Sequence, residues 1–460
     1  MKKIIAMLLA LVMVLGLVAC AAKTETPAAE TPAAETPAAE TPAAEEPAAE
    51  EPAAETPAAS GKVYYLNFKP EFDAALQELA ATYTEKTGVE VKVVTAASGQ
   101  YSDTLTAEMG KTSAPTIFNI GNMSGLNDWD EYALDLNGTA IADELTTNDF
   151  NLYNADGELK ALGHCYESFG IIVNTELLDK AGHSLDEIKD FASLKAVADD
   201  IHARADELGF DAFSSAGLDG SSSWRFSGHL ANMPLFYEFR DDDVTEAPAE
   251  ITGAYLDNFK NIWDLYITDS AADPTTLSTS TGDESKAQFV EGKAAFYQNG
   301  TWEYAGLKEA GMTDEQLAMI PIYCGVEGEE DAGLCSGTEN CWAINAKASE
   351  VDQKASIDFL VWLVTDPDAS ATYVEQLGAV PFKHCPDSTN KFIVDGNKLL
   401  SEGKYAVTWV FGYTPNVDSW RATVVTALAK YSADQTDANW DEVVSAFVDG
   451  WAIEYETVNG

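Results

Sequence analysis

The sequence predicts an α/β protein of two lobes, each built on a mostly parallel sheet flanked by helices. The first observation is size, because the chain has 460 residues and a single core stops growing at about 250–300. The second is an alternation of strand-like and helix-like stretches, which is typical of a parallel sheet. The third is a composition of 46% hydrophobic and 10% aromatic residues, which is enough to bury a core and excludes wholesale disorder.

The alternation begins just after residue 60. Strand and helix patterns follow each other in the order Val63–Phe68, Phe72–Tyr83, Val89–Val94, Gln100–Lys111 and Thr116–Ile120. Gly88 is predicted to end the first helix, because glycine is the usual residue at a helix C-terminus. This strand–helix–strand–helix–strand start indicates a parallel sheet with helices on both faces.

The carboxyl ends of these strands are the expected ligand edge. Open parallel sheets bind ligands in a crevice outside the carboxyl ends of their strands. The segments that follow the predicted strands are Asn67–Glu71, Ala97–Gln100 and Asn119–Asn122. We therefore expect all three segments to lie near one crevice.

The N-terminus is predicted to be a lipoprotein signal peptide covering residues 1–19. Lys2 and Lys3 precede an uncharged, mostly apolar run from Ile4 to Ala19, which is shorter than the about 20 residues of a membrane span. The run ends directly before Cys20, as in a bacterial lipobox, where the cysteine takes lipid and becomes the mature N-terminus. The alternative is an ordinary signal peptide with a chance cysteine.

Residues 20–60 are predicted to form a tether after the lipidated Cys20. From Thr26 to Ala59 the chain repeats a five-residue unit, Thr-Pro-Ala-Ala-Glu, in which Glu twice replaces Thr. Proline in every unit blocks a continuous helix, and the glutamates repel one another. We expect a stalk that holds the folded body away from the membrane, although a low-complexity insert without function would have the same physical properties.

The charge balance excludes several partners. The chain carries 76 acidic and 27 basic residues, a formal net charge of −49. Nucleic-acid binding and polybasic attachment to anionic lipid both need a basic surface, so neither is expected. The five histidines are scattered and no Cys-x-x-Cys pair occurs, so we predict no metal site and no cofactor.

The chain resembles the extracellular solute-binding proteins of ABC importers, in the carbohydrate-binding group that includes maltose-binding protein. The resemblance covers most of residues 62–455. It rests on the order and spacing of Lys62–Val94, Pro115–Phe118, Tyr166–Asn174, Phe289–Trp302, Cys341–Ile344, the helix Lys354–Val364 and Gly378–Pro381. Thr116 stands where the family usually has Asp, a minor departure.

The resemblance implies a two-lobe periplasmic-binding-protein-like fold of type II, whose lobes are joined by crossing strands and close on a sugar. It places crossings near Gly163–Phe169, Ile320–Cys324 and Ala379–Lys383. The first lobe is expected to combine 61–165 with 324–380, and the second 166–323 with 381–460. It also implies delivery of a sugar, expected to be an oligosaccharide, to ABC permease subunits at the extracellular face of the bacterial membrane. We expect a monomer.

Sugar recognition needs aromatic rings for the apolar faces and carboxylate or amide groups for the hydroxyls. By resemblance, Trp302 and Trp420 match family aromatics, and Glu167 matches a crossing-strand carboxylate that binds sugar hydroxyls. Trp224 lies in a polar loop with no helical stripe and is a third candidate. The predicted ligand-binding set is Trp302, Trp420, Trp224, Glu167, Glu71, Lys69, Asn119 and Asn122.

Structural roles compete with ligand binding at most of these positions. Trp302 and Trp420 could instead be core residues, as could Trp224, and Asn122 could be a turn residue before Gly125. Lys69 and Glu71 could be solvated residues around Pro70. Trp409 and Tyr413, which flank a turn-rich stretch, are weaker ligand candidates. Four tryptophans on apolar helical stripes and one before an alternating strand are predicted to be core: Trp263, Trp362, Trp440, Trp451 and Trp342.

The remaining cysteines allow two disulfide hypotheses, but the sequence does not determine their connectivity. With Cys20 assigned to lipid, five remain, namely Cys165, Cys324, Cys335, Cys341 and Cys385. Cys324 and Cys335 would face each other if Ile320–Gly325 and Leu334–Ile344 form a hairpin. Cys165 and Cys385 both fall near inferred crossings. Spacing alone does not establish either pair.

No motif supports an enzyme. Gly-x-Ser-x-Gly, P-loop and Gly-x-Gly-x-x-Gly patterns are absent, and acidic pairs are too common here to indicate a glycosidase. We therefore predict a binding protein. The alternative to transport is a surface glycan-binding lipoprotein that serves a sensor or a partner enzyme, because the tether and fold would look the same.

Overall fold

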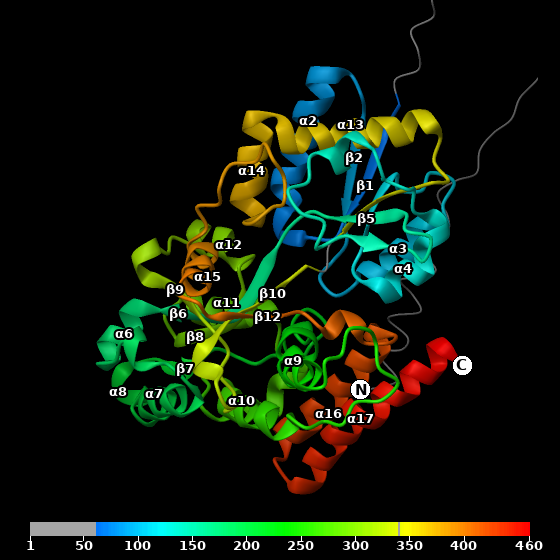
Figure 1. Ribbon diagram of the computed structural model, residues 1–460. Helices are drawn as coiled ribbons and strands as arrows, with labels where there is room; N and C mark the ends of the chain where they lie inside the picture. The colour runs from blue at the N-terminus through cyan, green and yellow to red at the C-terminus, as the bar shows by residue number, and fades with distance from the viewer. Residues whose placement is uncertain (1–60, 339–340) are drawn as a thin grey trace, which may run out of the picture. The chain divides into compact units, whose positions relative to one another are not determined.

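The computed structural model describes residues 61–338 and 341–460 (Figure 1). The predicted signal peptide, Cys20 and the tether lie outside the described residues. Within them, strands and helices alternate along the chain, and the strands form two sheets. An α/β fold was predicted, and this part of the prediction is confirmed.

The first sheet has six strands in the order β2-β1-β3-β11-β5-β4. In that order, the strands are Val91–Thr95, Val63–Asn67, Ile117–Ile120, Cys341–Ile344, Leu159–Gly163 and Leu152–Tyr153. β1 pairs in parallel with both β2 and β3, as the strand–helix alternation predicted. β11 runs antiparallel to β3 and β5, and β4 runs antiparallel to β5, so the other half of the sheet is antiparallel and the sheet is mixed instead of mostly parallel as expected.

Helices cover both faces of the first sheet (Figure 1). They are α2 (Asp73–Thr87), α13 (Glu350–Thr365) and α14 (Pro367–Leu377) on one face, and α3 (Tyr101–Met109) and α4 (Met123–Trp129) on the other. Successive strand residues alternate between the two cores, so Tyr65 packs with α2 and α13 while Leu66 packs with α3 and α4. Gly88, at φ 74°, ends α2 in the left-handed conformation, as predicted.

The second sheet has the strand order β12-β10-β6-β8-β7, and β9 pairs with β6. In that order, with β9 last, the strands are Tyr405–Thr408, Ala332–Gly337, Glu167–Asn174, Ala294–Gly300, Asp211–Phe213 and Leu317–Ile320. β6 is antiparallel to β8, β9 and β10, whereas β7 is parallel to β8 and β10 to β12. Strands β7, β8, β10 and β12 therefore all end at the edge where β6 begins.

Side chains of β6 alternate between two cores in the same way. Ile171 faces a large core, and Ile172 faces a smaller one. The large core includes α6 (Thr175–Ala181), α7 (Phe191–Ala203), α9 (Asn232–Asp241), α10 (Leu256–Thr268), α16 (Val417–Ala433) and α17 (Asp437–Asn459). The smaller includes α11 (Gly282–Val290), α12 (Glu303–Glu309) and α15 (Lys391–Ser401).

The chain passes between the sheets at three places. The first lies between Gly163 and Glu167, as predicted. The last lies between α14 and α15 and includes the predicted Ala379–Lys383. The middle crossing, predicted at Ile320–Cys324, instead lies between Gly337 and Cys341, because β9 and β10 both pair with β6. Residues 332–337, expected in the first lobe, therefore belong to the second sheet, while the remaining lobe boundaries stay predictions.

The tryptophans that were predicted to be core residues are buried or partly buried. Trp263, Trp342 and Trp451 are fully buried, and Trp440 is nearly so. Trp362 is partly buried and packs on Tyr83, with ring centroids 5.1 Å apart. Burial of these rings follows the apolar helical stripes and the strand pattern from which it was predicted.

The two disulfide hypotheses are wrong. All five cysteines of the described residues carry free thiols. The hairpin that would have paired Cys324 with Cys335 does not form, because β10 pairs with β6 and β12 instead. Cys165 is fully buried and Cys385 partly buried, and they are not joined.

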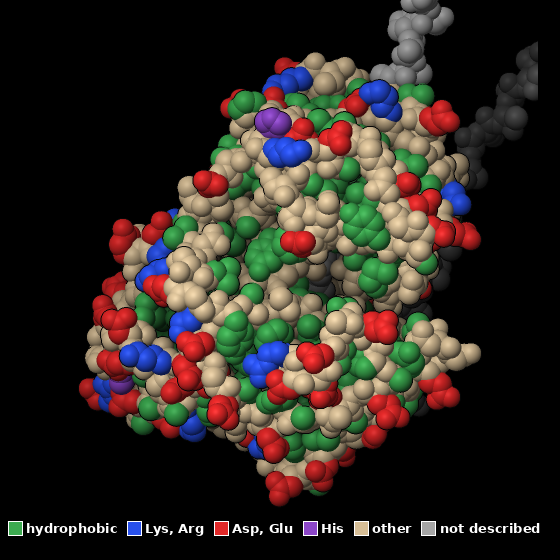
Figure 2. All heavy atoms as spheres, viewed as in Figure 1, with side chains coloured by type: hydrophobic (Ala, Val, Ile, Leu, Met, Phe, Trp, Pro, Cys, Tyr) green, Lys and Arg blue, Asp and Glu red, His purple; other side chains and the backbone are tan. Residues whose placement is uncertain are grey.

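Two surface properties bear on function. No helix among residues 61–338 and 341–460 is both long and apolar enough to span a membrane. Asp and Glu side chains are spread widely over the face shown in Figure 2, with fewer Lys and Arg among them, in line with the formal charge of −49. A polyanionic partner would meet repulsion from most of this surface.

Candidate functional site

Three tryptophans follow strands that end at the same edge of the second sheet. Trp302 comes two residues after β8, Trp409 directly after β12, and Trp224 after β7 as the N-cap of the next helix. All three are partly buried, so part of each indole stays exposed. Open α/β sheets bind ligands at the carboxyl ends of their strands, and the edge expected from the sequence was the corresponding edge of the first sheet.

Two glycines let these indoles lie against the strand ends. A Cβ atom added to Gly300, the last residue of β8, would lie 2.2 Å from ring atoms of Trp302. One added to Gly337, the last residue of β10, would lie 2.7 Å from Cγ of Trp409. Any other residue at either position would push the ring away, so glycine is required by the close approach.

The three indoles meet around one buried imidazole. The ring of His229 lies 5.5 Å from Trp224, 5.3 Å from Trp302 and 4.7 Å from Trp409 between centroids. Trp224 and Trp302 also contact each other, with centroids 5.7 Å apart and planes inclined by 51°. Burial, followed by the nearby Arg421 cation, lowers the pKa of His229 well below its usual range, so the imidazole is neutral. We call these four side chains the tryptophan cluster.

A buried ion pair lies at the first crossing. Nζ of Lys69 is 2.6 Å from Oε1 of Glu167 and 3.3 Å from Oε1 of Glu71. Lys69 and Glu167 are buried, whereas Glu71 is exposed. Burial alone would lower the pKa of Lys69, but the neighbouring charges, Glu167 above all, outweigh it and hold the pKa well above its usual range. Lys69 is therefore charged and the pair is ionic.

The two predicted asparagines have structural partners. Asn119 is buried in β3, and its Nδ2 lies 3.3 Å from Nε2 of His164. Asn119 is 3% exposed, as deeply buried as Glu167, and its contact with a ligand stays a prediction. Asn122 is the N-cap of α4, and its Oδ1 accepts a hydrogen bond from the Gly125 amide at 2.8 Å, so its structural role is that of a helix cap and not the turn residue given as the alternative. Asn122 is only partly buried and stays a candidate.

Trp420 is the clearest error among the predicted ligand residues. It is 1% exposed, and its Nε1 donates to the Phe447 carbonyl at 3.0 Å. Trp420 lies inside α16 (Val417–Ala433), and its ring joins the large core. The helical spacing of Trp420, Val424 and Leu428 indicated this buried face.

The two weaker ligand candidates, Trp409 and Tyr413, have different surroundings. Trp409 belongs to the tryptophan cluster, so its ranking below Trp420 was the wrong way round. Tyr413 instead packs on Phe239, with ring centroids 6.2 Å apart.

His229 was not singled out from the sequence. Its only signal was its place in an otherwise apolar and small stretch, Phe226–Leu230, soon after Trp224.

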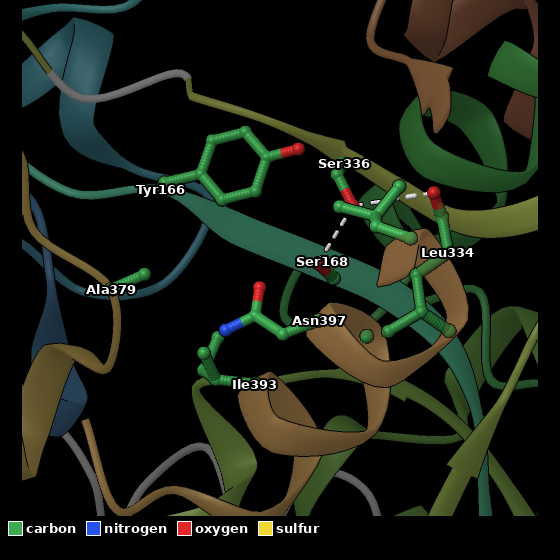
Figure 3. Close-up of a pocket in the computed structure, with 9 residues that line it drawn as sticks. Tyr166, Ser168, Leu334, Ser336, Ala379, Ile393 and Asn397 are labelled. Carbon is green, nitrogen blue, oxygen red and sulfur yellow. Dashed lines mark hydrogen bonds between the residues drawn. The ribbon is translucent and has the colours of Figure 1, made fainter. Parts of the chain in front are cut away.

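A small pocket lies on the face of β6 opposite to the side chain of Glu167 (Figure 3). Its labelled side chains include Tyr166, Ser168 and Ser336, and Oγ of Ser168 lies 2.7 Å from Oγ of Ser336. Because strand side chains alternate, Glu167 and Phe169 point away from Ser168 and toward the tryptophan cluster side. The pocket is therefore separate from the tryptophan cluster.

The site offers binding chemistry. Aromatic faces, a carboxylate and an ammonium group suit a ligand with both apolar faces and hydroxyls. No group of three His, Cys, Asp or Glu side chains within the described parts of the chain is arranged to hold a metal ion.

Residues 78–384 match the model of a family described as bacterial extracellular solute-binding protein. No curated protein is similar enough to the chain to count as a match. The family match covers most of both sheets and includes Trp224, Trp302 and Glu167.

Solved structures of solute-binding proteins share the fold. The complex of RafE with raffinose has a TM-score of 0.67 at 15% identity, covering 85% of this chain and 99% of that one. The GacH receptor of Streptomyces glaucescens, whose structures include an acarbose complex, has a TM-score of 0.63 at 19% identity, with coverages of 86% and 99%. A Streptococcus pneumoniae solute-binding protein bound to the blood group A-trisaccharide has a TM-score of 0.61 at 19% identity, with coverages of 85% and 99%. These likenesses confirm the predicted two-lobe fold.

Proposed function

The chain belongs to the bacterial extracellular solute-binding proteins, a family of binding proteins and not of enzymes, and on that basis we propose that it captures a sugar between its two lobes. The proposed ligand is an oligosaccharide. The observation that carries the proposal is the tryptophan cluster, in which three partly exposed indoles share one sheet edge. Indole faces pack on the apolar faces of pyranose rings.

Polar groups for the sugar hydroxyls come from the first crossing and from the first lobe. Glu167 and Lys69 supply a carboxylate and an ammonium group, and Glu71 supplies an exposed carboxylate. Asn122 has an amide nitrogen left for a ligand after its oxygen caps α4. Hydroxyls that bond to such groups fix the orientation of a sugar on the indoles.

Loops at the two ligand edges touch each other, which supports closure of the lobes on the sugar. Oγ of Ser98 lies 3.5 Å from the Ser221 carbonyl oxygen, and a Cβ added to Gly99 would lie 2.4 Å from the Gly220 carbonyl oxygen. Ser221 in turn accepts a hydrogen bond from Nε1 of Trp224 at 2.9 Å. A ligand that bridges both lobes would shift the population toward the closed arrangement.

The wider role follows from the family and from the N-terminal sequence. We propose that lipid on Cys20 anchors the protein at the extracellular face of the membrane, with the tether as a spacer. The closed, sugar-loaded form would deliver its ligand to the permease subunits of an ABC importer. Similar folds that bind raffinose, acarbose and a blood-group trisaccharide support a carbohydrate ligand.

A thermal-shift screen followed by titration calorimetry tests the proposal. Ligands that bind only the folded state raise the unfolding midpoint when present well above their Kd. The purified protein would be screened with neutral oligosaccharides, uronic-acid oligomers, amino acids and peptides. We expect a shift with one series of neutral oligosaccharides. Shifts with peptides or amino acids alone would overturn the sugar assignment while leaving the fold and family in place.

A further inference from the structure

A π-helix lies directly beside the tryptophan cluster. Arg225–Leu230 form this helix, and the Ala231 amide donates to the Phe226 carbonyl, five residues back, at 3.0 Å. It is the one π-helix in the described part of the chain, and all six of its residues are buried. π turns are rare, and they are frequent at functional sites.

The wider turn changes which side chains meet. Residues five apart in an α-helix are rotated by about 140° and point away from each other. A π turn closes between residues five apart, so their side chains come to the same face. Trp224 and His229 are five residues apart, and their rings are in contact at 5.5 Å. An α-helix over the same residues would separate them.

His229 supports all three indoles from behind. It is 3% exposed, whereas the tryptophans that it contacts are partly exposed. Phe169 and Phe411 pack on it as well, at 5.0 and 5.2 Å between centroids. The imidazole is therefore held in place by the protein and does not reach a ligand, but each indole rests against it.

Residues at the two ends of the π-helix, Arg225 and Asn232, are hydrogen-bonded to other parts of the second lobe. Arg225 donates to the Gln298 carbonyl on β8 at 3.1 Å and to Oγ of Ser285 at 3.0 Å. Asn232 donates to the Thr408 carbonyl at 2.9 Å and accepts from the Val410 amide at 2.7 Å, which holds the segment that carries Trp409. The number of residues between these two anchors determines where His229 lies.

We propose that His229, held by this π turn, is a positioning residue that fixes the three indoles as one surface and thereby sets affinity for the sugar without touching it. This inference rests on the proposed sugar-binding function. It predicts that an aromatic ring is required at position 229, because only a flat ring fills the space against three indoles at these distances.

Three variants test the proposal. His229→Leu removes the ring, His229→Phe keeps one, and Phe226→Leu is the matched control. Phe226 is a fully buried ring in the same π-helix, but it packs on Trp263, away from the tryptophan cluster. Calorimetric titration with the sugar found in the screen gives the affinity. Near-UV circular dichroism of the ligand-free proteins reports the packing of the indoles.

We expect His229→Leu to weaken sugar binding at least tenfold and to reduce the near-UV signal. His229→Phe should keep affinity within about threefold, and so should Phe226→Leu despite a lower unfolding temperature. Equal losses in His229→Leu and Phe226→Leu, or unchanged affinity in a folded His229→Leu, would overturn the proposal. A loss in His229→Phe as large as in His229→Leu would also overturn it, because the ring alone would not be enough.

The two proposals fail in different ways. If no sugar binds the unaltered protein, the proposed function is wrong. The positioning of the indoles is then judged by the near-UV signal alone, which should fall in His229→Leu and not in Phe226→Leu. If His229→Leu does not fold, the comparison of His229→Phe with the unaltered protein decides.

Discussion

The ammonium nitrogen of Lys69 lies 2.6 Å from Oε1 of Glu167, and the two residues are 4% and 3% exposed. Lys69 follows β1 of the first sheet, and Glu167 is the first residue of β6 in the second. The pair therefore joins the two sheets at the first crossing. An ion pair this deeply buried is costly to break, because removal of one partner leaves the other charge in a medium of low polarity.

Removal of one charge of this pair should destabilise the protein strongly. We expect Lys69→Met to lower the free energy of unfolding by about 3–5 kcal/mol, measured by urea denaturation. The double variant Lys69→Met/Glu167→Gln should recover part of that loss. Lys86→Met is the control, because the Lys86 side chain is 47% exposed in its pair with Asp366, and its loss should cost about 1 kcal/mol or less. Equal stability of Lys69→Met and the unaltered protein would contradict the buried ion pair.

Loss of an exposed indole should affect binding more than stability. Trp302→Ala is expected to weaken sugar binding at least tenfold, or about 1.4 kcal/mol, because the sugar loses a stacking surface. The variant should still fold, since Trp302 is only partly buried. Titration calorimetry gives the affinity, and far-UV circular dichroism checks the fold. A folded variant with unchanged affinity would remove Trp302 from the site.

Trp420→Ala should show the opposite pattern. Its ring is 1% exposed in the large core, so truncation should cost about 3–5 kcal/mol of stability. The fraction that remains folded should bind sugar with nearly unchanged affinity, because the ring is not at the ligand edge. Urea denaturation and titration of the same sample separate the two effects. A large loss of affinity with full stability would restore Trp420 as a ligand residue.

Local patterns predicted the α/β class and the parallel start of the first sheet, whereas the crossings came from the resemblance. The strand–helix alternation from Val63 to Ile120 predicted a parallel sheet, and β1 does pair in parallel with β2 and β3. The middle crossing was misplaced because nothing in the residues around Ile320 reveals that β9 and β10 both pair with β6. Such pairings join residues far apart in sequence, and local periodicity carries no information about them.

The candidate site combines residues singled out from the sequence with residues that were missed. Trp302 and Glu167 were candidates by resemblance and Lys69 by its place after a strand, and their contact with a ligand stays a prediction. His229 was missed because its role depends on a π turn, which no residue pattern in Arg225–Leu230 signals. Trp420 was misplaced because its match to a family aromatic was given more weight than its helical spacing with Val424.

Cys20 gives a prediction that depends on the sequence alone, since it lies outside the described residues. Cys20→Ser removes the thiol that would take lipid, so the variant should leave the membrane fraction. Cell fractionation and immunoblotting measure the shift. Ala21→Ser is the control and should stay with the membrane. Retention of Cys20→Ser in the membrane fraction would favour another mode of attachment.

The stability contributed by His183 should depend on pH. Its Nδ1 lies 3.0 Å from Oε2 of Glu187, and its Nε2 lies 2.9 Å from Oδ2 of Asp200. Partial burial lowers the pKa of His183, but hydrogen bonds to Asp200 and then Glu187 outweigh burial and raise it above its usual value. The folded protein then binds this proton more tightly than the unfolded chain, whose histidine pKa is about 6.5.

The stabilising effect of His183 is therefore complete below about pH 6.5 and is lost as the pH rises through the higher pKa of the folded state. We expect His183→Gln to be less stable than the unaltered protein by up to about 1 kcal/mol at pH 5.5, and the difference should shrink toward pH 8.5. Urea denaturation at several pH values measures this difference. The contribution of His164 to stability should change with pH in the opposite direction. Burial, followed by the Lys69 charge, lowers the pKa of His164 well below the usual range, so protonation of this residue at low pH reduces the stability of the fold. A difference for His183→Gln that grows with pH would contradict the assigned ion pairs.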